Sequence, residues 1–220
     1  AACYVFLGAT NAPREMLSMA YISTLVTQLA PILLVGYITT MLSADTRSAL
    51  SRIKLLSETD ELTGIYNRRA LLAMLERMLN LSNRYGHALS ILMIDADSLK
   101  DVNDSMGHES GNRLLKLTVE AIQKQLRDTD VLARYGGDEF VVLLPETPCK
   151  ESFEVAERIR RSAEIKFTNR HQELTTSVSI GIASFPDHGK ELEALLEKAD
   201  QAMYLSKNKG KNRVTVYFSS

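Results

Sequence analysis

Hydrophobic and polar positions follow two different periods along this chain, and the periods predict its elements. In several stretches apolar residues recur every three or four positions, which is typical of helices with one buried face. The expected helices are 67–85, 111–126, 150–166 and 192–206. Shorter runs rich in Val and Ile predict strands. The expected strands are 89–94, 131–133, 141–144, 175–183 and 214–216.

The order of these elements is irregular, with one hairpin between 131–133 and 141–144. Such an order predicts an α+β sandwich with a central, mainly antiparallel five-stranded sheet flanked by helices. The Asn67 side chain is suited to cap the start of the first of these helices.

The N-terminal part has a different pattern, because no charged residue occurs from Met16 to Ala44. This length is sufficient to cross a bilayer, and the Arg and Lys residues that follow predict a cytoplasmic C-terminal side. Thr and Gln residues dilute the run, so an amphipathic dimerisation helix is the alternative. The apolar segment 1–9 before it suggests the end of an earlier span, and hence a fragment of a larger membrane protein.

Three segments are therefore expected: a membrane-spanning or hydrophobic helix (1–44), a linker helix (45–58) and a globular domain (59–220). The net charge of −1 gives no reason to expect a nucleic-acid polymer as partner. Two distant cysteines, Cys3 and Cys149, exclude a disulfide framework and favour a reducing compartment.

Candidate chemistry begins at the hairpin tip, where Gly136 and Gly137 precede Asp138 and Glu139. Two glycines allow a ligand to approach the backbone closely, and adjacent carboxylates suit a divalent cation with its phosphates. Asp95 ends an apolar strand, so it would meet Asp138 if the two strands are neighbours. The alternatives are a solvated acidic turn and a strand-end cap, and Asp97 is expected to be a solvated acid.

Two other segments are suited to phosphate. Ser98, Leu99 and Lys100 are expected at the start of a short helix, whose backbone N–H groups attract anions. Lys207 and Lys211 lie four residues apart where the last helix ends, and two cations there would neutralise a leaving pyrophosphate. The alternative for such lysines is a basic helix terminus that complements the helix dipole.

These features occur together with further ordered blocks, and over 60–216 the sequence resembles the GGDEF family of diguanylate cyclases. The blocks are DELTGIYNRR (60–69), DADSLK (95–100), ND with GHESG (103–111), RYGGDEF (134–140), VSIGIA (178–183) and ADQAMY with KNKGKNR (199–213). The resemblance implies the palm-like fold of adenylyl cyclases and polymerases, with GTP as substrate and Mg²⁺ or Mn²⁺ as cofactor.

The resemblance also implies roles for individual residues. Metal ligands would be Asp95, the Ala96 carbonyl, Asp138 and Glu139, and Glu139 would alternatively help to deprotonate the attacking hydroxyl. The implied catalytic residues are Asp138, Glu139 and Lys207. The implied substrate-binding residues are Leu62, Ser98, Leu99, Lys100, Asn103, Asn112, Leu115, Gly136, Gly137, Lys207 and Lys211. Product inhibition by cyclic di-GMP would involve Arg127, Asp130 and Arg158; the alternative for the first two is a simple pair between themselves.

The chain departs from the family pattern at two positions. Asn112 replaces an Asp, and an amide has one acceptor and one donor group where guanine offers two donors. Lys211 replaces the usual Arg, which keeps the charge but not the bidentate fork.

The expectation is a membrane-tethered homodimer in the inner membrane of a bacterium, with the catalytic domain in the cytoplasm, converting two GTP into cyclic di-GMP. The alternatives are a promiscuous synthase that also uses ATP, and an inactive module that binds GTP or cyclic di-GMP.

Overall fold

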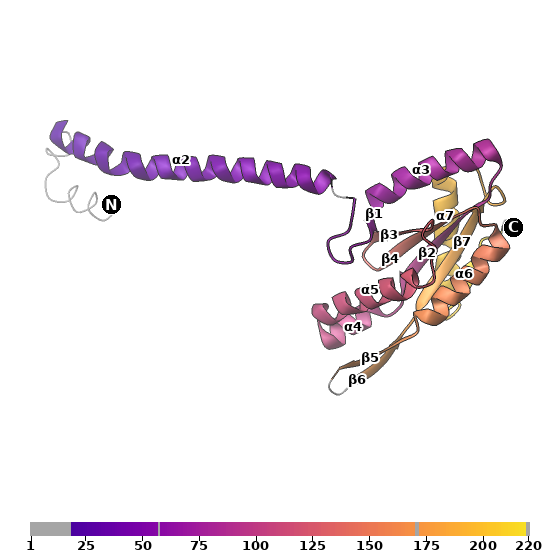
Figure 1. Cartoon of the computed structure of the whole chain (residues 1–220). Helices are drawn as coiled ribbons and strands as arrows, with labels where there is room; N and C mark the ends of the chain where they lie inside the picture. Colours follow the sequence, from indigo (N-terminus) through magenta and orange to yellow (C-terminus); the bar gives the residue numbers. More distant parts are fainter. Residues whose placement is uncertain (1–18, 57, 170–171, 219–220) are drawn as a thin grey trace. The chain divides into compact units, whose positions relative to one another are not determined.

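A computed structural model describes the chain at residues 19–56, 58–169 and 172–218 (Figure 1). The chain divides into two compact units, 1–57 and 58–220, and each is considered by itself. The apolar segment 1–9 lies outside the described residues.

Within the first unit the described part is one continuous helix, α2 (Met19–Leu56). The boundary expected near residue 44 between a hydrophobic segment and a linker therefore falls inside this helix. Its stretch Ile22–Leu42 is, among the described residues, the one helical segment with the length and composition to cross a membrane. At 1.5 Å per residue its 21 residues extend about 31 Å, close to the thickness of a bilayer core.

The second unit is built on a central sheet that has six strands in the described part of the chain, one more than expected. The additional strand is β1 (Tyr66–Asn67), which pairs parallel with β3 (Val131–Gly136). The order is β1-β3-β4-β2-β7-β8. The remaining strands are β2 (Leu89–Ala96), β4 (Glu139–Pro145), β7 (Val178–Phe185) and β8 (Val214–Val216). β8 is also parallel to its neighbour, whereas the three pairings between β3, β4, β2 and β7 are antiparallel, as predicted.

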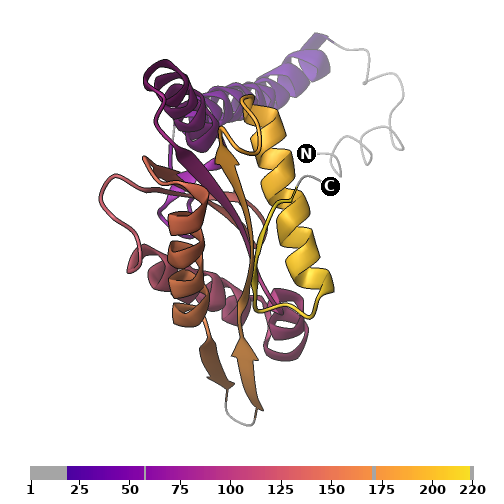
Figure 2. The same ribbon diagram turned by 90° about the vertical axis from the view of Figure 1, so that its right-hand side faces the viewer.

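Helices cover both faces of this sheet, and Figure 2 shows α6 and α7 on opposite sides of the strands. α3 (Arg68–Tyr85) and α7 (Leu192–Asn208) pack on one face, and α5 (His108–Gln123) and α6 (Cys149–Ser162) pack on the other. The short α4 (Leu99–Met106) packs against α5. The α3 start was predicted correctly, because the Ala70 N–H donates to Asn67 Oδ1 at 3.0 Å.

Successive side chains of β2 point to opposite faces of the sheet. Leu89, Ile91 and Met93 join the core under α3 and α7, whereas Leu92, Ile94 and Ala96 join the core under α5 and α6. A strand that is buried on both faces has a nearly continuous run of apolar residues. This explains why apolar and polar residues do not alternate in 89–94.

A second hairpin lies outside the central sheet. β5 (Ile165–Asn169) and β6 (Gln172–Thr176) pair with each other and project from the body of the unit (Figure 1). The predicted helix 150–166 was therefore too long, because α6 ends at Ser162. The predicted strand 175–183 covered parts of two strands, β6 and β7. The short polar β5 and β6 lack the apolar pattern that identified the other strands.

Gly181 allows α7 to approach the sheet. A Cβ at this position would lie 2.1 Å from both the Ala199 carbonyl oxygen and the Met203 nitrogen, which are backbone atoms that cannot rotate away. The close contact of β7 with α7 therefore depends on the absence of a side chain here.

We predict that Gly181→Ala destabilises the unit by about 3 kcal/mol or more, since helix and strand must separate. Urea unfolding followed by circular dichroism measures this. Gly136→Ala is the matched control, because a Cβ there has no neighbour within 4 Å. Its stability should stay within about 0.5 kcal/mol of the parent. Equal stability of the Gly181 variant and the control would contradict this packing account.

Candidate active site

Three carboxylates meet at one end of the sheet, at the junction of β2 with β4. Asp95 on β2 is paired with Glu139 on β4, and the Ala96 N–H donates to the Asp138 carbonyl at 3.0 Å. Asp95 continues the odd-numbered positions of β2, and Glu139 those of β4, so both belong to the α7 face. The structure thus brings together the residues expected to converge here.

The ammonium group of Lys207 partly neutralises this negative charge. Lys207, near the end of α7, places its Nζ 2.6 Å from Asp95 Oδ2, and the Asp95 side chain is only 5% exposed. Burial is the largest cause that raises the pKa of Asp95 to about 6; the charges of Asp138 and Asp97 contribute to this rise, and Lys207 opposes it. For Lys207, burial lowers the pKa, but the hydrogen bond to Asp95 and the neighbouring carboxylates raise it overall.

The pKa of Glu139 is also raised by its surroundings. Burial raises its pKa, the charges of Asp200 and Asp138 add to that effect, and Lys207 counteracts it. A carboxylate with a raised pKa is a stronger base than an ordinary glutamate. The cluster therefore holds more negative charge than its lysine balances.

These residues fit a divalent cation that is shared with a ligand. In the described part of the chain, no three His, Cys, Asp or Glu side chains are grouped as a complete protein-only metal site. Asp95, Asp138 and the Ala96 carbonyl, the ligands expected from the sequence, could supply part of the oxygen donor set of Mg²⁺, with phosphate oxygens and water supplying the rest. Excess negative charge on buried carboxylates is the electrostatic condition for such binding.

Asp97 differs from the expectation of a solvated acid, because it is buried, with 2% exposed. Its carboxylate accepts hydrogen bonds from Ser177 Oγ at 2.6 Å, Ser179 Oγ at 2.8 Å and the Asn212 N–H at 3.2 Å. Sequence reasoning missed this role because its partners are 80 or more positions away. Ser177, directly before the 178–183 block, and Ser179 within it were the available signal.

The expected phosphate-binding segments flank the carboxylates in the chain. Ser98 has a left-handed backbone with φ of 67° and immediately precedes α4, while Lys100 in the first turn is exposed. Lys211 follows α7 and is exposed as well, with φ of 60°. Its N–H donates to the Ser206 carbonyl at 3.1 Å, which fixes its backbone to the end of α7.

The expected base-binding residues lie around α4 and α5. Leu62 and Leu99 pack on the same core cluster that contains Leu115. A Cβ on Gly111 would come within 2.0 Å of Asn103 Oδ1, so the Asn103 side chain lies directly against the first turns of α5. Asn112 is the next residue of α5 and is exposed.

The expected inhibitory residues share one corner. The Arg127 N–H donates to Asp130 Oδ2 at 2.8 Å, so this carboxylate closes a turn rather than forming the side-chain pair considered above. Arg158 on α6 donates to the Gln125 carbonyl at 3.2 Å, two residues before Arg127. Arg127 and Arg158 are both exposed around this turn.

Arg134 holds the tip of the β3–β4 hairpin through hydrogen bonds. Its Nε and Nη2 donate to the Gly137 carbonyl at 3.0 and 2.7 Å, and its Nη1 contacts Asp60 Oδ1 at 3.1 Å. Asp60 also accepts from the N–H and hydroxyl of Thr63. Sequence reasoning missed Arg134, whose place beside the two glycines was the available signal.

A cavity of about 1130 Å³ lies between α3 and α7 and contains Glu139 and Asp200 in its lining. The described residues that line it include neither Asn103 nor Asn112. This cavity therefore touches the carboxylate cluster but is separate from the expected base-binding residues.

Comparison with known proteins agrees with this geometry. Residues 57–213 match the family model described as diguanylate cyclase, GGDEF domain. This match covers more than half of the chain, so the chain belongs to the GGDEF diguanylate cyclase family.

Individual relatives extend the comparison. The chain is 39% identical to the diguanylate cyclase DosC of Escherichia coli over 164 residues, which is 73% of this chain and 35% of that protein. It is 36% identical to the response regulator PleD of Caulobacter vibrioides, covering 72% of this chain and 36% of PleD. The chain thus spans about a third of the length of these relatives.

Solved structures show the same fold. The GGDEF domain of YfiN from Pseudomonas aeruginosa has a TM-score of 0.69 at 35% identity, covering 73% of this chain and 94% of that one. The GGDEF domain of DgcB from Caulobacter crescentus, solved in complex with c-di-GMP, also has a TM-score of 0.69, at 29% identity, covering 74% and 97%.

The raised pKa of Asp95 predicts a pH dependence of stability in metal-free protein. A carboxyl group whose folded pKa is raised binds protons more tightly in the folded state, so stability falls as pH rises from about 4 to about 6. Asp95→Asn removes this charge. We expect the variant to be about 1–3 kcal/mol more stable than the parent at pH 8, with the difference vanishing near pH 4.

The matched control is Asp97→Asn, since an amide cannot accept from all three donors around Asp97. It should cost about 1–3 kcal/mol at pH 8. Urea unfolding in EDTA at both pH values measures both changes. An Asp95→Asn protein that is less stable than the parent at pH 8 would contradict the assigned electrostatics.

Proposed function

We propose that the protein condenses two GTP molecules into cyclic di-GMP and releases two pyrophosphates. The observation that carries the proposal is the register that pairs buried Asp95 with Glu139 beside Lys207. This arrangement combines acidic metal ligands, a base and a cation at one sheet end, which nucleotidyl transfer requires.

Each half of the reaction is a displacement at phosphorus. The 3′-oxygen of one GTP forms a bond to the α-phosphorus of the other, and the bond from that phosphorus to the bridging oxygen of the β-phosphate breaks. Pyrophosphate leaves with the electron pair, and the hydroxyl proton passes to a base. Glu139 is suited to accept it, because burial and the charges of Asp200 and Asp138 raise its pKa.

Asp95, the Ala96 carbonyl and Asp138 would hold Mg²⁺ or Mn²⁺, and Glu139 would be a further ligand only in the alternative in which it does not act as the base. When bound, the cation would neutralise the triphosphate and polarise the reacting phosphoryl oxygens. The Lys207 ammonium contacts Asp95. Once the cation binds Asp95, this ammonium would be able to contact the leaving phosphates instead. Lys211 would supply the second positive charge, and Ser98 and Lys100 would bind the phosphates from α4.

The symmetric product requires two copies of the chain, because one site activates one GTP only. Homodimerisation would bring the two sites face to face. α2 would anchor the dimer in the inner membrane of a bacterium, with the GGDEF domain in the cytoplasm. The apolar stretch Ile22–Leu42 supports this anchor by its length and composition.

The test is incubation of the purified protein in detergent with GTP and Mg²⁺, followed by chromatography and mass spectrometry of the products. Cyclic di-GMP and two equivalents of pyrophosphate are expected. Asp138→Ala should lower the rate by about 10³-fold or more, as expected when a metal ligand is removed. Failure to form any cyclic dinucleotide would favour the inactive binding module instead.

Asn112 favours a second activity, a synthase that also accepts ATP. An amide satisfies the guanine edge only in part, whereas its donor and acceptor both suit adenine. We expect Asn112→Asp to raise the ratio of kcat/KM for GTP over ATP by about 10- to 100-fold, equivalent to 1–3 kcal/mol. Competition between the two nucleotides measures the ratio. An unchanged ratio would remove Asn112 from base recognition.

The corner formed by Arg127, Asp130 and Arg158 would bind cyclic di-GMP and inhibit turnover. Two guanidinium groups beside a carboxylate suit a guanine nucleotide, through phosphate contacts and the guanine edge. We expect Arg127→Ala to raise the inhibitory concentration of cyclic di-GMP by about tenfold or more at an unchanged initial rate. Inhibition as strong as in the parent would place the inhibitory site elsewhere.

A further inference from the structure

The turn that carries Lys211 has an unfavourable backbone conformation. Gly210, Lys211 and Asn212 all have positive φ, at 107°, 60° and 46°. Only the first of them is a glycine, and a residue with a Cβ is disfavoured in this region. Contacts with the rest of the unit must therefore stabilise the turn.

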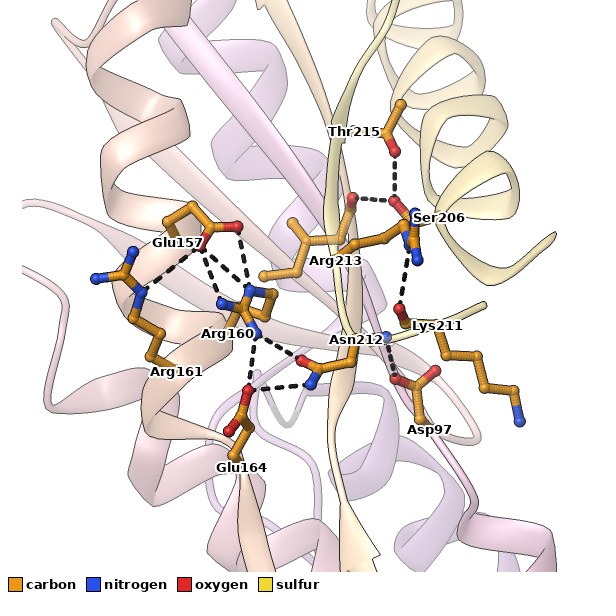
Figure 3. A network of polar contacts seen from close by, with 11 residues as sticks. Asp97, Glu157, Arg160, Arg161, Glu164, Ser206, Lys211, Asn212, Arg213 and Thr215 are labelled. Carbon is orange, nitrogen blue, oxygen red and sulfur yellow. Dashed lines mark hydrogen bonds and ion pairs between the residues drawn. The ribbon is translucent and has the colours of Figure 1, made fainter. Parts of the chain in front are cut away.

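Two groups of contacts hold this turn through Asn212 (Figure 3). On the backbone side, the Asn212 N–H donates to Asp97 Oδ2 at 3.2 Å. On the side-chain side, Asn212 Oδ1 accepts from Arg160 Nη1 at 2.8 Å, and Asn212 Nδ2 donates to Glu164 Oε1 at 3.0 Å. Asn212 thus connects the end of β2 with α6 and the residues directly after it.

Arg160 is itself fixed in place. Its Nε and Nη2 donate to the Glu157 carboxylate at 3.1 Å, and its Nη1 also donates to Glu164 at 2.8 Å. The side chain is 17% exposed, so the planar guanidinium is held by three partners in a fixed orientation. Arg161, the next residue, has a 74% exposed side chain and only a 3.7 Å approach to Glu157.

This network adjoins the turn that carries Lys211, the proposed phosphate ligand, and hydrogen bonds join Arg160 and Glu164 to each other and to Asn212. Figure 3 shows the Lys211 side chain extending out of the network, while Arg160 and Glu164 face Asn212. Asp97 joins the network to the active site, because it lies two residues after Asp95. The ammonium of Lys211 is therefore directed by a turn whose shape depends on α6.

We infer that Arg160 is a positioning residue that holds Lys211 toward the triphosphate through Asn212. The inference rests on the proposed function only in that Lys211 binds phosphate. Removing the guanidinium releases the Asn212 amide and lets the strained turn relax, which withdraws one cation from the β- and γ-phosphates. Contacts with the base and the α-phosphate do not involve this turn.

The test measures binding rather than turnover. The probe is 3′-deoxy-GTP with Mg²⁺, which keeps the triphosphate but lacks the attacking hydroxyl, and GMP with Mg²⁺ is the comparison ligand. Calorimetry on the full chain in detergent gives both dissociation constants. We expect Arg160→Gln to weaken 3′-deoxy-GTP by about tenfold and to leave GMP within about twofold. Arg161→Gln is the matched control and should change neither ligand.

A double-mutant cycle separates positioning from a general structural role. In a Lys211→Met background, Arg160→Gln should have no further effect on 3′-deoxy-GTP, because the cation that it positions is absent. Asn212→Ala keeps the Cβ, and therefore the strain of the left-handed backbone, and removes only the amide, so it should weaken binding like Arg160→Gln. This variant keeps the test decisive if Arg160→Gln does not fold.

Equal weakening of GMP, or an Arg160→Gln effect that persists without Lys211, would overturn the inference. Unchanged binding of 3′-deoxy-GTP by the folded Arg160→Gln or Asn212→Ala protein would do the same. Failure of the proposed function gives a different result, in which no cyclic dinucleotide forms while these binding differences are still present.

Discussion

The antiparallel register of β2 with β4 is the constraint on which the site depends. It pairs Asp95 with Glu139, and the two-residue period of strands places both carboxylates on the face covered by α7. A slip of β4 by one residue would turn Glu139 to the opposite face and separate it from Asp95 and Lys207. The apolar residues of β2 and β4, buried on both faces, make such a slip costly and so fix the chemistry at the sheet end.

The contact of α7 with β7 is the second requirement. Gly181 lets the helix lie against the strand, and this brings Lys207 to within 2.6 Å of Asp95. The lysine lowers the electrostatic cost of three neighbouring carboxylates only in part, because burial still raises the pKa of Asp95. The folded protein thus maintains an unfavourable charge distribution that the proposed cation would relieve, as in other active sites where function costs stability.

The sequence predicted much of this arrangement, and the errors have physical causes. Local patterns identified β2, the β3–β4 hairpin and the Asn67 cap, since each depends on neighbouring residues. β1 and the β5–β6 hairpin were missed because two residues, or five mainly polar ones, give no periodic signal. The boundary expected near residue 44 follows a change of composition, and the backbone of α2 continues through it.

In the site, too, the residues identified from the sequence were those that depend on neighbouring positions. Asp95, Asp138 and Glu139 were identified because they end or join strands, but the burial of Asp97 depends on serines far along the chain and on Asn212. The link from Arg160 to Asn212 spans 52 positions and has no local signature. Contacts of this kind appear only once the fold brings the end of β2, α6 and the C-terminal turn together.

The most direct test of the account is a titration of the Asp95 carboxyl by carbon-13 NMR in metal-free protein and with Mg²⁺ and 3′-deoxy-GTP. Without ligands the account predicts a pKa of about 6. With Mg²⁺ and the nucleotide analogue the pKa should fall below the ordinary range of an aspartate, because a cation then stabilises the charged form. A carboxyl that titrates near 4 and does not respond to Mg²⁺ and nucleotide would contradict the central claim.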